Sequence, residues 1–76
     1  MDNIRKISIG PDYKGSAMHY ILGQRVLGDT NEIHLIRFDE QTNSFKIFIS
    51  NDKKEVLLWK EFNATIPVAL VYNINI

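Results

Sequence analysis

Cysteine is absent from this chain of 76 residues, and histidine occurs only at positions 19 and 34. The chain therefore forms no disulfide and offers no thiolate ligand to a metal. The two histidines are too far apart to match a metal-binding motif. We expect neither a metal site nor a bound cofactor.

An excess of charge is also missing, because nine basic and nine acidic side chains cancel. Binding to duplex nucleic acid depends on clustered Lys and Arg that displace counterions, so the composition argues against it. Hydrophobic runs long enough to span a membrane are absent, and no apolar segment follows the N-terminus as in a secretion signal. We expect a cytoplasmic protein that does not bind membranes.

The chain is short, so the hydrophobic core that it can bury is small. We expect a single domain over residues 1–76, and a domain of this size buries only about 60% of its unfolded surface. Small domains usually add disulfides, a metal or a partner subunit. Since the first two are excluded and 45% of the residues are hydrophobic, we expect a homo-oligomer.

Alternation of apolar and polar residues dominates the second half of the chain. It predicts strands over residues 32–39, 45–50, 56–62 and 68–76, separated by turn-forming residues. Consecutive antiparallel hairpins, a four-stranded meander, are the simplest arrangement of these strands. The long apolar strand 68–76 is expected at an edge, where it would pair with a second copy of the chain.

Within these strands the pattern assigns particular faces. Ile33 and Leu35 are predicted on one face of strand 32–39, with apolar residues on the other face as well, which is typical of a central strand. Phe45, Ile47 and Ile49 are predicted to share a face of the next strand. Trp59 is expected to pack in the core.

The first half supplies one or two further strands. Residues 4–9 alternate, and residues 17–22 form either a strand that continues past Gly23 or a short helix with Ser16 as its N-cap. His19, Tyr20 and Ile21 favour the strand, and Gly23 would cut the helix to under two turns. The predicted fold class is all-β: a small SH3-like or partly open barrel, or a twisted antiparallel meander, of five to six strands.

The stretch 8–20 contains the candidate functional residues, because glycine, proline and serine interrupt regular structure there while polar and aromatic side chains gather. Glycines let backbone amides approach a ligand, Lys14 offers charge to a phosphate or carboxylate, and tyrosines can stack on a ring. Arg25 could meet the same negative charge. The candidate ligand-binding residues are Tyr13, Lys14, Ser16, His19, Tyr20 and Arg25.

The same loop, residues 10–16, also has a purely structural interpretation. Pro11 and Asp12 suit a type I turn that ends at Gly15, and the spacing does not match a phosphate-binding loop. Catalysis has little support, because Ser16 and His19 are sequence neighbours without an implied orienting acid. We expect a protein that is not an enzyme.

Two runs carry a resemblance to known proteins: Ile-Ser-Ile-Gly-Pro-Asp-Tyr-Lys at 7–14, then Ala-Met-His-Tyr at 17–20 with Gly-Gln at 23–24. They resemble a group of small accessory proteins of tailed phages, as do residues 58–63 and 72–75. The resemblance covers most of the chain but supplies no known activity or binding residues. It implies action in the host cytoplasm, where such proteins commonly counter host defences.

Two functional hypotheses follow. In the first, an oligomer binds and sequesters a small anionic ligand, such as a cyclic dinucleotide or another nucleotide-derived immune signal. In the second, the protein is an inhibitor or adaptor that binds a host protein through the loop or through its last strand. Single-stranded nucleic-acid binding through aromatic side chains is a weaker alternative, since the net charge is zero.

Overall fold

The computed structural model describes residues 4–9, 18–64 and 68–71, and every regular element among them is a β-strand. The strands are β1 (Lys6–Ile9), β2 (Met18–Ile21), β3 (Arg25–Val26), β4 (Asn31–Asp39), β5 (Ser44–Asn51), β6 (Val56–Asn63) and β7 (Val68–Val71). The all-β prediction is confirmed, with six strands of four or more residues and the two-residue β3. Residues 18–21 form a strand and not the alternative helix. The predicted turn at Pro11 and Asp12 and the end of the last strand, 72–76, lie outside the described residues.

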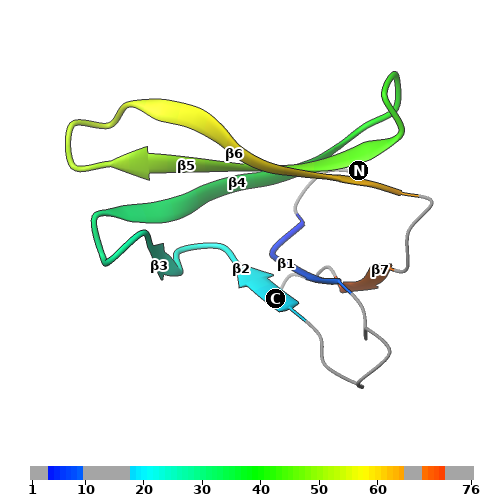
Figure 1. Ribbon diagram of the computed structural model, residues 1–76, viewed down its shortest axis with the longest axis horizontal. Coiled ribbons are helices and arrows are strands. Elements are labelled where there is room, and N and C mark those ends of the chain that lie inside the picture. Colours follow the sequence, from blue (N-terminus) through cyan, green and yellow to red (C-terminus); the bar gives the residue numbers. More distant parts are fainter. Residues whose placement is uncertain (1–3, 10–17, 65–67, 72–76) are drawn as a thin grey trace.

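The strands form two antiparallel sheets, ordered β2-β1-β7 and β3-β4-β5-β6. The four-stranded sheet curves over the three-stranded one, as Figure 1 shows, and the result is a partly open barrel. The predicted meander from residue 32 onward is correct for β4, β5 and β6 only. β7 does not follow β6 in the same sheet but crosses to the other sheet, where it pairs with β1. Because β7 crosses to the other sheet, it covers an edge of β1 whose backbone groups would otherwise be unpaired.

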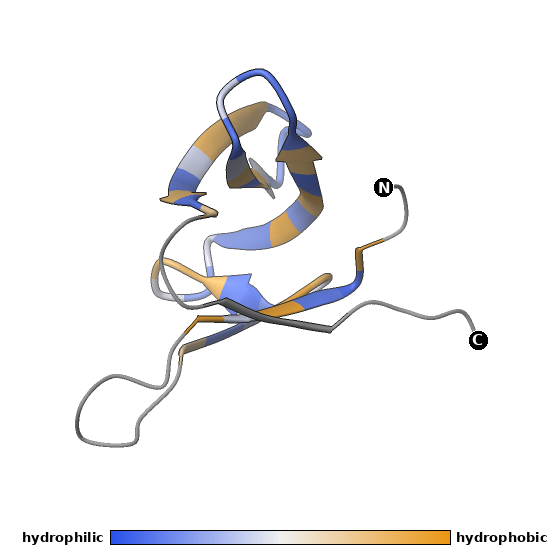
Figure 2. Cartoon of the chain, turned by 90° about the vertical axis from the view of Figure 1, so that its right-hand side faces the viewer, coloured by the Kyte–Doolittle hydropathy of each residue, from blue (hydrophilic) through white to orange (hydrophobic). Residues whose placement is uncertain are grey.

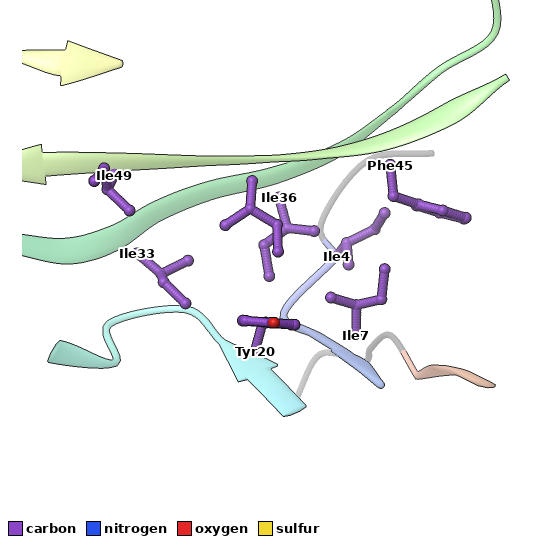
Figure 3. Close-up of a cluster of buried hydrophobic side chains, with 8 residues drawn as sticks. Ile4, Ile7, Tyr20, Ile33, Ile36, Phe45 and Ile49 are labelled. Carbon is purple, nitrogen blue, oxygen red and sulfur yellow. The ribbon is translucent and has the colours of Figure 1, made fainter. Parts of the chain in front are cut away.

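The core lies between the two sheets (Figure 3). Bands of apolar and polar residues alternate along the strands in Figure 2, because successive side chains of a strand point to opposite faces. The buried apolar residues are Ile4, Ile7, Tyr20, Ile33, Ile36, Phe45, Ile47 and Ile49. Phe45, Ile47 and Ile49 share the inner face of β5 as predicted. Burial of each isoleucine contributes about 1.5–3 kcal/mol relative to exposure.

Two β-bulges change the faces that simple alternation predicts. In β4, Ile33 is opposite Ile49 and Leu35 is opposite Phe48, so His34 has no partner on β5. The strand therefore points Ile33 inward and Leu35 outward, and the prediction that these two share a face is wrong. An extra residue in one strand also increases its local twist, which helps the sheet to curve.

The second bulge lies in β6. Lys60 is opposite Ile47 and Leu58 is opposite Phe48, which leaves Trp59 unpaired between them. Trp59 is partly buried and packs against the core, as the sequence predicted. Its ring meets Tyr20 of β2, so the bulge connects the two sheets.

Candidate functional site

Three of the six predicted ligand-binding residues can be located. Tyr13, Lys14 and Ser16 lie outside the described residues, as does the whole loop 10–16. His19 and Tyr20 lie on β2 of the three-stranded sheet, whereas Arg25 lies on β3 of the other sheet. No hydrogen bond or ion pair joins these three side chains to one another in the described part of the chain.

His19 is exposed and lies directly opposite Ser8 of β1. Ser8 Oγ and His19 Nδ1 are 2.8 Å apart and form a hydrogen bond, which fixes the orientation of the imidazole. Ser8 itself is buried. A serine beside a histidine is also the beginning of a nucleophilic site, but such a site needs an accessible hydroxyl and a third group that orients the base. Ser8 is covered, and no described carboxylate bonds to His19.

Tyr20 belongs to the core, with 6% of its surface exposed. Its ring meets Trp59 edge to face at a centroid distance of 5.9 Å and tilts against Phe62 at 5.7 Å. Burial raises the pKa of the Tyr20 hydroxyl, which favours the neutral form. These contacts occupy the ring that we expected to stack on a ligand.

Arg25 is exposed but already paired. Its Nε lies 3.2 Å from Asp29 Oδ1 and its Nη1 lies 3.4 Å from Glu32 Oε1, and a further bond runs to the Asp29 carbonyl. The hydrogen bond with Asp29 raises the pKa of Arg25. An anion at this site would compete with two carboxylates that already hold the guanidinium.

Three of the exposed large apolar residues, Leu35, Val56 and Leu58, lie on the outer face of the four-stranded sheet, a feature that alternation did not predict. Leu35, Phe48 and Leu58 are paired directly across β4, β5 and β6, and directly opposite residues share a face. We call these three residues the apolar row. Leu35 is 39% exposed and Leu58 is 44% exposed, while Phe48 is partly covered. Val56, opposite Ser50, extends the exposed apolar surface along β6, whereas Leu57 lies opposite Ile49 on the other face of the sheet.

A polar row follows the apolar row on the same face. Arg37 of β4 lies opposite Lys46 of β5, which lies opposite Glu61 of β6. Lys46 Nζ donates to Asp39 Oδ2 at 2.8 Å, and Ser44 Oγ donates to Glu61 Oε2 at 2.7 Å. The bond with Asp39 raises the pKa of Lys46, and the same bond lowers the pKa of Asp39.

An open hollow of about 490 Å³ lies beside Arg37 and Lys46, at the end of β4. Its lining includes Arg37 and Lys46, the ring of Phe48, and Asp39 with the turn that follows it. A smaller hollow of about 180 Å³ lies near Arg25 and Asn51. The lining of the larger hollow holds the two cations, Phe38 and Phe48, and also the carboxylates of Asp39 and Glu40, so its formal charges cancel.

Metal chemistry has no support in the described residues, where no group of three His, Asp or Glu side chains converges. Within the same residues no helix is long and apolar enough to cross a membrane.

Comparison of the chain with protein-family models, with curated proteins and with solved structures finds no match in any of the three. The site must therefore be interpreted from its own geometry.

Proposed function

We propose that this protein is a non-enzymatic binding module that takes a protein partner on the outer face of its four-stranded sheet. The observation that supports the proposal is the apolar row, which leaves Leu35 and Leu58 exposed on both sides of Phe48. Exposed apolar side chains are common singly, whereas contiguous patches mark interaction surfaces. Interfaces typically have such an apolar centre, often with an aromatic residue, inside a polar rim.

The rim is present on this face. The pairs Lys46–Asp39 and Arg25–Glu32 lie on either side of the apolar row along the strands. β6 is an edge strand in the described sheet, so its free side offers backbone groups to an extended segment of a partner. A partner would then gain main-chain hydrogen bonds and apolar contacts together.

The experiment uses the purified chain as bait in a lysate of the cells in which it is made, with Leu58→Lys as the test variant. Leu27→Lys is the matched control, because Leu27 is 54% exposed but lies on the turn after β3, away from the apolar row. We expect a stoichiometric partner with the parent and with the control, and its loss with Leu58→Lys. The identified partner is then purified and its binding to all three proteins is measured by calorimetry.

Native mass spectrometry of the parent chain tests whether the partner is a second copy, as the homo-oligomer prediction holds. Dimers that Leu58→Lys abolishes would assign the face to self-association. A parent that stays monomeric and captures nothing, or a Leu58→Lys variant that binds as well as the parent, would refute the proposal.

A second candidate function is the capture of a small anionic ligand, such as a nucleotide-derived signal in a host cell under phage attack. The observation that favours it is Arg37, which is exposed and forms no ion pair with any described carboxylate. His19 is the one predicted ligand-binding residue that is described, exposed and free of an ion pair. Titration of nucleotides into the parent and into Lys14→Ala tests the loop 10–16 as the site.

A further inference from the structure

Two cations face each other across β4 and β5 where a neutral or oppositely charged pair would be more stable. Arg37 lies directly opposite Lys46, and like charges at directly opposite positions repel. The pKa of Lys46 is raised, chiefly by its hydrogen bond with Asp39, and the charge of Arg37 opposes this shift. Asp39 forms an ion pair with Lys46, and Glu61, which lies opposite Lys46 on β6, also stabilises the charge of Lys46. The guanidinium of Arg37 is left without an anionic partner among the described residues.

The open hollow is lined by these two cations, by Phe38 and Phe48, and by the carboxylates of Asp39 and Glu40, so Arg37 is the lining cation that has no ion-pair partner among the described residues. Its volume of about 490 Å³ falls within the range of about 300–1,000 Å³ that small-molecule sites have. Phe48 lies beside Lys46 on the same strand face, two residues away, and opposite Leu35. A ligand that filled the hollow would thus meet a guanidinium at one side and an aromatic surface at the other.

We infer that this hollow binds a phosphate or carboxylate group attached to a flat ring. The guanidinium of Arg37 donates two parallel N–H bonds to the anionic oxygens, an arrangement that suits both groups. The flat ring covers Phe48 and removes apolar surface from water. Bound anion also relieves the repulsion between Arg37 and Lys46, so binding and the stability of the sheet are coupled. This inference rests on the second candidate function and deepens it. It shares Phe48 with the apolar row, so a bound ligand and a protein partner would compete for that ring.

The test is an NMR titration of the full chain with four probes: adenosine 5′-monophosphate, benzoate, inorganic phosphate and adenosine. The first two carry an anion on a flat ring, and the last two carry the anion or the ring alone. We expect the amide signals of residues 37–41 and 46–48 to shift with the first two probes, and to shift less with the others. If only benzoate of these two binds, the hollow prefers a carboxylate. If only adenosine 5′-monophosphate binds, the hollow prefers a phosphate.

Three variants locate the site. Arg37→Gln should weaken binding at least about tenfold, because it removes a charge-assisted pair of hydrogen bonds. Asp39→Asn should strengthen binding, because it removes a negative charge from the hollow and frees Lys46. Arg5→Gln is the control: Arg5 is equally exposed, but it precedes β1 and is not part of the hollow. Its binding should match the parent.

Failure has distinct forms. No shift with any probe would overturn this inference, whereas the second candidate function fails only if the nucleotides titrated into the parent chain do not bind either. Shifts that Arg37→Gln leaves unchanged would overturn this site alone and retain a small-ligand function elsewhere. Equal binding of inorganic phosphate and adenosine 5′-monophosphate would overturn the role of the ring. None of these results bears on the protein partner, whose test depends on Leu58.

Discussion

Tyr20 and Trp59 meet edge to face, with an angle of 82° between their rings and 5.9 Å between their centroids. Tyr20 comes from β2 of the three-stranded sheet and Trp59 from the bulge of β6 in the other sheet. The pair therefore joins the two layers of the core. Edge-to-face pairs of this kind contribute about 0.5–1.5 kcal/mol beyond the burial of their area.

We predict that Tyr20 acts through packing and not through its hydroxyl. Tyr20→Ala should lower the free energy of unfolding by about 3–5 kcal/mol, because it leaves a cavity between the sheets. Tyr20→Phe should change it by less than about 1 kcal/mol, since the hydroxyl bonds to no partner among the described residues. Urea unfolding followed by the fluorescence of the single tryptophan measures both. An equally large loss in the two variants would contradict this assignment.

Lys54 should be replaceable by glycine with a gain in stability. Asn51 and Glu55 close a hairpin through Asn51 N–H and the Glu55 carbonyl, with three residues between them, and Lys54 has a φ of 67°. A side chain in this left-handed region costs about 1–2 kcal/mol, and glycine loses about 0.5–1 kcal/mol in extra entropy. Lys54→Gly should therefore gain about 0.5–1 kcal/mol.

Lys53 provides the control for this hairpin, because its φ is not positive. Lys53→Gly removes the same charge and adds the same entropy to the unfolded chain, but it relieves no strain in the folded chain. The melting temperature of this variant should therefore fall. A rise of about 2–6 °C is expected for Lys54→Gly in a domain of this size. Equal melting temperatures for the two variants would show that the turn carries no strain.

Deletion of His34 should be tolerated, whereas deletion of a paired neighbour should not. His34 is the unpaired residue of the β4 bulge, so its removal leaves Ile33, Ile36 and Phe38 on the core face in simple alternation. Deletion of Arg37 would instead turn Phe38 outward and Asp39 inward. Thermal unfolding and proton NMR should show that the His34 deletion variant is folded but less stable than the parent, because the sheet loses twist. The Arg37 deletion variant should be unfolded.

The Asp39–Lys46 pair predicts a loss of stability in acid. Lys46 lowers the pKa of Asp39, so the folded chain binds this proton more weakly than the unfolded chain. The stability that the pair adds is present above the unfolded pKa of about 4 and is lost as the pH falls through the lower, folded pKa. For Lys46, whose pKa is raised, the loss comes as the pH rises through the folded pKa, above about 10.4.

Asp39→Asn should flatten the acid part of this profile, measured as the urea midpoint between neutral pH and about pH 3. Glu40→Gln is the matched control, because it removes a neighbouring carboxylate that forms no ion pair with a described cation. The effect should shrink in high salt, since the pair is partly exposed. A parent profile that Asp39→Asn does not alter would rule out a contribution from the pair.

Much of the fold follows from the chain alone. The alternation of residues 45–50 placed Phe45, Ile47 and Ile49 on one buried face, and Gly23 favoured the strand that became β2 over the alternative short helix. The absence of cysteine ruled out disulfides, and Trp59 was correctly assigned to the core. These features depend on period and composition, which are local properties of the sequence.

The tertiary structure decided the rest. The bulges at His34 and Trp59 depend on how two strands pair, so no local pattern reveals them, and they set which leucines face outward. The pairing of β7 with β1 is a long-range choice between two open edges. The sequence suggested Arg25 as an anion-binding residue, but in the folded chain Asp29 and Glu32 form ion pairs with it. Arg37, which the sequence did not single out, lines a hollow and forms no ion pair with a described residue. A side chain's chemistry is fixed by its type, but its availability depends on the neighbours that folding brings to it.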